Sequence, residues 1–95
     1  MPGGRVVFRL HAVRRMFERG ISEQDVYDVL ARGVVIEEYP YDRPYPSRLL
    51  LARVRSHPVH VVVAENREEQ TLVVITVYEP DPARWAPGFR KRTAP

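Results

Sequence analysis

The sequence predicts an α+β domain in which two N-terminal helices pack on a mostly antiparallel sheet, in the order β-α-α-β-β-β-β, ahead of an irregular C-terminal tail. Apolar residues recur at helical spacing between residues 11 and 32 and at strand spacing between residues 34 and 79. From Pro80 onward, prolines prevent regular strand pairing. We therefore expect a single domain over residues 1–95, with its core at about residues 5–79 and a basic, proline-rich tail at residues 80–95.

The chain is expected to begin with a strand at about residues 5–10 and a helix at about residues 11–19. Val13, Met16 and Phe17 share one side of this helix, which is its apolar side. The opposite side carries polar and charged residues: His11, Arg14, Arg15 and Glu18. The first helix therefore presents a cationic face that includes a histidine.

A sharp corner between the two helices is predicted from five residues between positions 20 and 26. Gly20 supplies the left-handed residue that ends the first helix. Ser22 caps the second helix, with Asp25 at its third helical position. Ile21 and Val26 are spaced to form a hydrophobic staple across the start of the second helix.

The second helix covers about residues 23–32 and stops at Gly33. The period then changes from helical to extended, in segments rich in Val, Ile and Leu. We expect four strands here, over residues 34–39, 48–55, 58–65 and 71–79.

The strand pattern also predicts a register. If Glu65 pairs with Thr71 and a tight turn lies at Ser56-His57, one face of the sheet is wholly aliphatic and is expected to carry the helices. That face contains Leu50, Ala52, Val54, Val59, Val61, Val63, Val73, Ile75 and Val77. The opposite face contains Leu49, Leu51, Arg53, His60, Val62, Val74, Thr76 and Tyr78. Trp85 and Phe89 of the tail are expected to cover part of that second face.

Composition narrows the class of protein. There is no cysteine, which excludes disulfides, thiolate catalysis and cysteine-based zinc sites. No segment has the roughly 18 apolar residues that a membrane span needs, and the start lacks a signal peptide. We expect a cytoplasmic protein with no membrane partner and no metal or organic cofactor. Fourteen of the 15 basic residues are arginine, which is typical of GC-rich coding or hot habitats, or of phosphate recognition.

The strongest candidate for chemistry is a polar cluster at one end of the second face, formed by Arg53, His60, Thr76 and Tyr78. Histidine can act as general acid or base near neutral pH, and arginine can hold a phosphate. This combination suits metal-free RNA cleavage by attack of the ribose 2′-OH. The alternative is a structural histidine bonded to a neighbouring side chain. Under the catalytic hypothesis, replacing His60 by Gln abolishes cleavage and leaves the melting temperature nearly unchanged.

Three further regions are candidates for binding RNA. The cationic groups are His11, Arg14, Arg15 and Arg19 on the first helix and Arg90, Lys91 and Arg92 in a tail that has no acid after Asp81. The alternative is an ordinary solvated surface. Tyr45, in a loop of alternating tyrosines and prolines, is expected either to stack on an RNA base or to pack on the domain's own surface.

These residues also resemble a known family, the domain-of-unknown-function family numbered forty-two fifty-eight. The similarity runs from about Val6 to Phe89 and rests on His11-Ala12-x-x-Arg15-Met16-x-x-Arg19-Gly20-Ile21-Ser22-x-x-Asp25-Val26, Gly33-x-Val35-Ile36, Pro44-Tyr45-Pro46-Ser47, His60-Val61-Val62-Val63 and Ile75-Thr76-Val77-Tyr78. That family is similar to BrnT and RelE-like toxins of type II toxin–antitoxin pairs. The resemblance implies an RNA-cleaving or RNA-binding domain whose partners are RNA and a small antitoxin encoded by a neighbouring gene.

Two functions from different classes follow. In the first, the chain is a RelE-like ribonuclease toxin in which His60 is base or acid, Arg53 and Arg48 hold the phosphate, and Tyr78 assists. In the second, it is a non-catalytic protein-interaction module that uses the face carrying Val62 and Val74. The sequence leaves open whether RNA is cleaved or only bound, and whether the chain is a homodimer.

Overall fold

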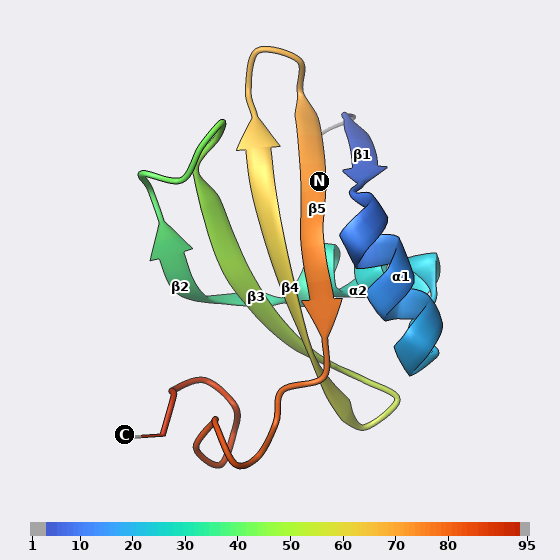
Figure 1. Cartoon of the computed structure of the whole chain (residues 1–95), viewed down its shortest axis with the longest axis vertical. Coiled ribbons are helices and arrows are strands. Elements are labelled where there is room, and N and C mark those ends of the chain that lie inside the picture. The colour runs from blue at the N-terminus through green and yellow to red at the C-terminus, as the bar shows by residue number, and fades with distance from the viewer. Residues whose placement is uncertain (1–3, 94–95) are drawn as a thin grey trace.

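A computed structural model describes residues 4–93 and confirms the α+β fold (Figure 1). The first three residues of the expected domain, and the last two of the expected tail, lie outside this range. The elements are β1 (Arg5–Phe8), α1 (Leu10–Arg19), α2 (Glu23–Arg32), β2 (Val34–Tyr39), β3 (Ser47–Val54), β4 (His57–Asn66) and β5 (Thr71–Tyr78). One sheet contains all five strands in the order β1-β5-β4-β3-β2, and only the β1–β5 pair is parallel.

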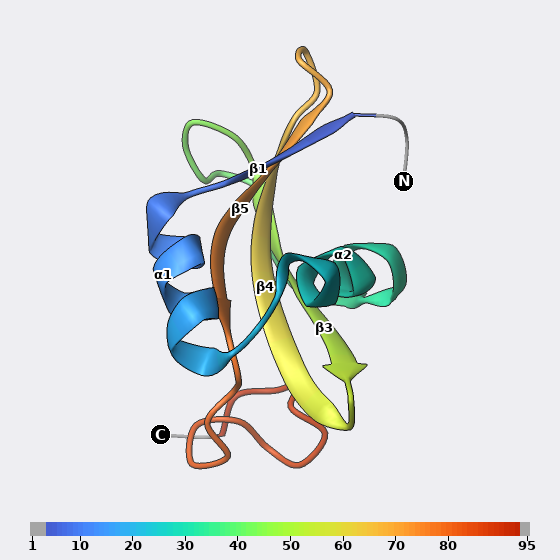
Figure 2. The ribbon, with the colours of Figure 1, turned by 90° about the vertical axis from the view of Figure 1, so that its right-hand side faces the viewer.

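The sheet has two unlike faces. We call the face that carries Leu50, Ala52, Val59, Val61 and Val63 the helix face, because α2 packs on it against β3 and β4. In Figure 2 the sheet is seen edge-on with α2 on one side. The opposite side, turned toward the viewer in Figure 1, is the front face, which carries Leu49, Leu51, His60, Val62, Ala64 and Tyr78.

The predicted corner between the helices is confirmed. Gly20 ends α1 in the left-handed conformation, with φ of 65°. Ser22 Oγ accepts a hydrogen bond from the Asp25 amide at 3.1 Å, and the Asp25 carboxylate accepts one from the Ser22 amide at 3.0 Å. Ile21 and Val26 on either side are buried, as the predicted staple requires.

The predicted apolar side of α1 is wrong in part. Ala12 and Met16 are the buried residues of this helix, whereas Val13 is 45% exposed and Phe17 is 89% exposed. Helix α1 lies beside β5 at the border of the sheet (Figures 1 and 2), and β5 is the strand that it mainly contacts. Only a narrow stripe of the helix therefore reaches the core.

The predicted faces of β3 and β4 are confirmed, although the turn lies one residue earlier than expected. Arg55 and Ser56 form a two-residue turn, with φ of 48° and 70°, and Val54 pairs with His57. Because this pairing is two residues away from the predicted one, each side chain keeps its face. Val59, Val61 and Val63 are buried on the helix face, as predicted.

The predicted register of β4 and β5 is wrong. Asn66, not Glu65, pairs with Thr71, and a β-bulge follows. Val63 pairs with Val74 while Val62 pairs with Thr76, which leaves one extra residue in β5 between the two pairs. The extra residue lets both Val74 and Val77 enter the core, and Val73 turns to the front face beside Ala64.

This bulge changes the surface named in the second functional hypothesis. Val74 is completely buried in the core, while Val62 is half-buried on the front face. Of the two, only Val62 therefore lies on the front face, and the protein-interaction hypothesis stays a prediction. Within residues 4–93, neither helix is long and apolar enough to cross a membrane.

Candidate functional site

His60 lies in the middle of a closed polar cluster at the lower end of the front face, and its side chain is completely buried. Its Nε2 is 2.8 Å from the backbone carbonyl of Phe89, which only accepts hydrogen bonds, so Nε2 is the donor. Its Nδ1 is 3.2 Å from the Tyr78 hydroxyl, which then donates to it. The predicted cover by the tail is confirmed, and both ring nitrogens are already in use.

Aromatic rings close the space around the imidazole. The Trp85 ring packs edge-on at 4.5 Å between centroids, and the Tyr78 ring does so at 5.2 Å. Burial lowers the pKa of His60, and the positive charge of Arg92 acts in the same direction, against the Phe89 carbonyl and Glu37. His60 is therefore held as a neutral imidazole out of solvent.

The tail is tied to the front face by a second set of contacts. Arg92 donates from Nε to Glu37 of β2 at 3.0 Å and from Nη2 at 3.1 Å, and its guanidinium stacks over Trp85 at 4.7 Å. This pairing holds the pKa of Glu37 below its usual value. Tyr39 also donates a hydrogen bond to Glu37, and burial, with this bond, raises the pKa of Tyr39 to about 12.

The structure does not bring together the cluster predicted around His60. Tyr78, not Thr76, lies opposite His60 in the ladder. Arg53 lies at the β3–β4 turn, where its guanidinium is 3.4 Å from the Ser56 carbonyl. Of the four predicted residues, only the pair of His60 and Tyr78 remains. The earlier β3–β4 turn places Leu51 rather than Arg53 opposite His60, and the shifted and bulged register of β5 moves Thr76 away.

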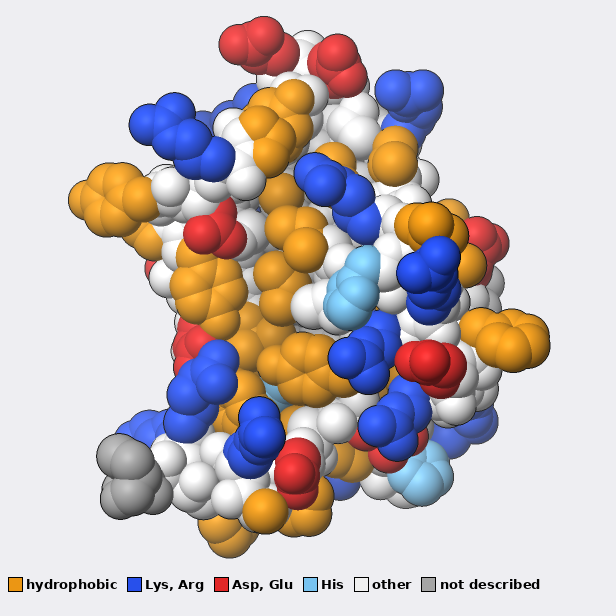
Figure 3. Space-filling view, viewed as in Figure 1, with side chains coloured by type: hydrophobic (Ala, Val, Ile, Leu, Met, Phe, Trp, Pro, Cys, Tyr) orange, Lys and Arg blue, Asp and Glu red, His pale blue; other side chains and the backbone are white. Residues whose placement is uncertain are grey.

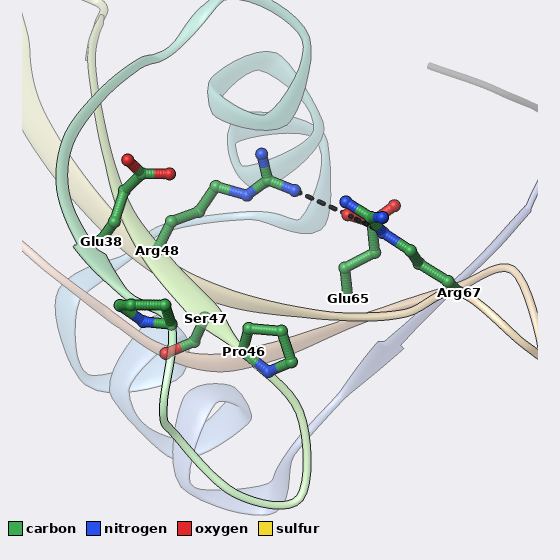
Figure 4. Close-up of a pocket in the computed structure, with 7 residues that line it drawn as sticks. Glu38, Pro46, Ser47, Arg48, Glu65 and Arg67 are labelled. Atoms are coloured by element: carbon green, nitrogen blue, oxygen red, sulfur yellow. Dashed lines mark hydrogen bonds and ion pairs between the residues drawn. The ribbon is translucent and has the colours of Figure 1, made fainter.

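Arg48, the second predicted phosphate ligand, lies on the other side of the sheet. It pairs with Val63 on the helix face and forms an ion pair of 2.9 Å with Glu65 (Figure 4). Its spacing of two residues from Leu50 already places it on that face. The sheet therefore separates Arg48 from His60.

A different histidine is accessible on the front face. His11, in the first turn of α1, is exposed, and its Nε2 is 3.0 Å from the Thr76 hydroxyl of β5. Arg14, Arg15 and Arg19 on the same helix are exposed, as the sequence predicted. The contact between His11 and Thr76 joins the cationic helix to the sheet.

The space-filling view shows how these groups are arranged on the front face. Figure 3 shows a strip of hydrophobic side chains along the strands, with Lys and Arg side chains on one side over α1 and on the other over the tail. Arg90 and Lys91 of the tail are exposed, whereas Arg92 is engaged with Glu37. The front face therefore offers an apolar surface between two cationic borders.

Tyr45 packs against the domain itself. It is half-buried, and its hydroxyl accepts a hydrogen bond of 2.9 Å from the side chain of Asn66. Tyr41, in the same loop, is instead 93% exposed. Sequence reasoning singled out the loop but did not distinguish these two rings.

The contact of Arg92 with Glu37 and Tyr39 was also missed from the sequence. These residues are 55 and 53 positions apart in the chain, so no local spacing relates them. The one usable signal was the pair Trp85 and Phe89, which predicted that the tail folds back on the sheet.

The chain was compared with known proteins. Residues 8–79 match the model of a family described as Domain of unknown function (DUF4258). No curated protein and no solved structure matches the chain. The matched segment spans β2 to β5 and both helices, and the tail that covers His60 follows it. Since the match covers most of the chain, the protein belongs to the DUF4258 family.

Proposed function

We propose that this domain binds RNA on its front face, as the toxin of a RelE/BrnT-like type II toxin–antitoxin pair. The observation that carries the proposal is the apolar strip between two cationic borders (Figure 3). The exposed His11 lies beside β5, where it contacts Thr76. RNA offers the matching chemistry, because phosphates pair with guanidinium groups and bases cover apolar surface. A small antitoxin from a neighbouring gene is the proposed protein partner.

In this proposal the first contacts come from α1. Arg14, Arg15 and Arg19 are exposed, and Arg15 has an acidic neighbour only at 3.9 Å, in Glu18. Exposed ion pairs of this kind are weak, so a phosphate can compete for the guanidinium. Arg90 and Lys91 would hold the RNA chain at the other border.

His11 is the imidazole that RNA can reach. It keeps one ring nitrogen on Thr76, and it is exposed, whereas His60 is sealed by Trp85 and the Phe89 carbonyl. A general base must come within hydrogen-bond distance of the 2′-OH. If the bound RNA is cleaved, we therefore assign the acid–base role to His11 and the role of holding the tail to His60.

The binding step is tested with a fluorescent single-stranded RNA. Replacing Arg14, Arg15 and Arg19 together by Gln should weaken binding by about tenfold or more and lower the slope of log affinity against log salt by about 2. Arg32→Gln, an exposed arginine on α2, is the matched control and should change little. Absence of binding at low salt, or an equal loss in the control, would contradict the proposal.

Toxicity and cleavage need a separate experiment. The chain is induced in cells with and without the neighbouring gene, and the purified protein is incubated with RNA in the presence of EDTA. We expect growth arrest that the neighbouring gene relieves, and RNA cleavage that His11→Gln removes. RNA binding without arrest or cleavage would leave an RNA-binding domain and reject the toxin.

A further inference from the structure

A second concave surface lies on the helix face, away from the proposed RNA surface. It is a hollow of about 580 Å³ between the C-terminal end of α2 and the β4–β5 turn. Its apolar lining includes Leu30, Val35, Leu50, Val63 and Leu72. Leu30 and Leu72 are only half-buried and Val35 is 46% exposed, so this part of the core is incompletely covered.

The charged groups around the hollow are mostly cationic. Arg48 and Arg67 converge on Glu65, at 2.9 and 3.8 Å (Figure 4), and Arg5 contributes a third guanidinium to the lining. Glu65 thus partly neutralises two arginines, and the hollow keeps an excess of positive charge. Glu38 lies in a smaller adjoining pocket of about 200 Å³.

The shape of the hollow indicates what it can hold. Residues from all five strands contribute to it, so it crosses the whole width of the sheet. Strands spaced about 4.8 Å apart make this width about 19 Å. A helix rises about 1.5 Å per residue, so about 13 residues would span the hollow beside α2.

We propose that this hollow docks an amphipathic helix of a partner protein, with the apolar side of the helix on Leu50, Val63 and Leu72 and acidic residues beside Arg48 and Arg67. Burial of the apolar side supplies the affinity, and the arginines select acidic flanks. The hollow lies on the opposite side of the sheet from the front face. Docking of the helix in the hollow therefore does not depend on RNA binding.

Neither helix of a second copy of this chain offers the surface that the hollow would need. The buried side of α2 is already packed on the sheet through Val26 and Val29. Helix α1 has exposed apolar residues in Val13 and Phe17, but it has no acidic residue in its first turn and ends in Arg19. Its charges would repel the arginines of the hollow.

The test is a selection from displayed peptides of about sixteen residues, followed by NMR mapping of the selected peptide on the protein. We expect enriched sequences with apolar residues at helical spacing and Glu or Asp beside them. The bound peptide should shift the methyl signals of Leu50, Val63 and Leu72. Its affinity should fall about tenfold or more in Val35→Glu and in Arg67→Glu.

Both substitutions are at exposed positions, because Val35 is 46% exposed and the Arg67 side chain is 88% exposed. Unchanged amide spectra elsewhere in the protein establish that each variant folds. Arg9→Glu makes the same charge change at an exposed position outside the hollow and should leave the affinity unchanged.

Three results would overturn the proposal. They are enriched peptides without acidic residues, a peptide that maps to another surface, and a wild-type protein that self-associates through Val35 with no peptide present. RNA binding is measured on the same variants. These variants leave the front face unchanged. RNA binding should therefore be lost in the Arg14, Arg15 and Arg19 variant and kept in the Val35 and Arg67 variants, which separates the two proposals.

Discussion

The two faces of the sheet are closed in different ways. The helix face is closed by aliphatic side chains from β3, β4 and α2, and among its core residues Val61 and Val29 are completely buried. The lower front face is closed by single polar contacts, such as those from His60 to Phe89 and from Arg92 to Glu37. Apolar burial tolerates small shifts of partner, whereas hydrogen bonds do not. This difference decides which substitutions matter on each face.

The two histidines of the front face illustrate the same contrast. His60 is completely buried with both nitrogens bonded inside the protein, while His11 is exposed and has a hydrogen-bond contact with Thr76. One imidazole is therefore part of the fold and the other is accessible to a ligand. Substitutions at the two sites should separate stability from binding.

The largest effect is expected for His60→Gln. The glutamine side chain cannot reproduce both hydrogen bonds or the ring contacts with Trp85, so we expect a loss of about 3 kcal/mol in the free energy of unfolding. This reverses the expectation from the sequence that melting is nearly unchanged. Urea unfolding of His60→Gln and His11→Gln measures the difference. We expect His11→Gln to have near wild-type stability. Equal stability of the two variants would contradict the structural role of His60.

The same substitution has a pH signature. Burial lowers the pKa of His60 below 6.5, so the unfolded chain binds a proton more readily than the folded one. The stability due to neutral His60 is therefore complete above about pH 6.5 and is lost as the pH falls toward the lowered pKa. Wild-type protein should lose stability over this range, and His60→Gln should lose less. Parallel pH profiles for the two proteins would rule out this linkage.

On the helix-face side, the largest polar effect is expected at the start of α2. Arg55 donates to both oxygens of Asp25, at 2.6 and 2.9 Å, and with the Ser22 amide it lowers the Asp25 pKa from 3.8 to about 2. We expect Asp25→Asn to lower the free energy of unfolding by about 2 kcal/mol at neutral pH. This value allows for solvent screening, because the Arg55 side chain is exposed. The contribution is present above about pH 4 and lost as the pH falls toward 2.

Urea unfolding at several pH values tests this prediction. The difference between wild type and Asp25→Asn should shrink as the pH falls from neutrality to about 2. Asp28→Asn is a suitable control, because the Asp28 carboxylate is 49% exposed and its contact with Arg32 is 3.9 Å long. A constant difference at all pH values would assign the effect to helix capping alone.

A smaller effect is expected for Ser22→Ala. It removes the oxygen that accepts from the Asp25 amide at 3.1 Å, and loss of such a cap costs about 1 kcal/mol. The second bond of the capping box, from the Ser22 amide to Asp25, remains. Thermal unfolding measures the change, with Ser22→Asp as a control that keeps an acceptor at the cap. An unaltered melting temperature in Ser22→Ala would show that the cap contributes nothing.

The sequence was sufficient for the features that depend on local pattern. Gly20, Ser22 and Asp25 fixed the corner between the helices, and the alternation of Leu50, Ala52 and Val54 fixed the face of β3. These signals involve neighbours a few residues apart. Their physical basis, capping and burial, does not depend on the rest of the fold.

The cluster around His60 was predictable only where it depended on local sequence patterns. The bulge between the Val62–Thr76 and Val63–Val74 pairs has no sequence signal as strong as a glycine. Together with the one-residue shift at Thr71, it displaced Thr76 from His60. Arg92 meets Glu37 only because the tail turns back, with an isolated bridge between Trp85 and Arg92. Long-range polar contacts of this kind require the register of every intervening strand.

The smallest effect on stability, and the sharpest test of the front face, is expected for Arg92→Gln. Its ion pair with Glu37 is largely exposed, with 61% of the Arg92 side chain accessible, so its loss should change the free energy of unfolding by only a few tenths of a kcal/mol up to about 1. The local effect should be larger, because Arg92 joins the tail to β2 and also stacks on Trp85. We expect faster hydrogen exchange at the amides of Trp85 and Thr93, which bond within the tail, while amides of β4 stay protected. Lys91→Gln removes a neighbouring charge with no such contact in the described residues and serves as the control. If the tail amides exchange at the wild-type rate in Arg92→Gln, then Trp85 and His60 alone hold the tail, and the front face is closed by burial much as the helix face is.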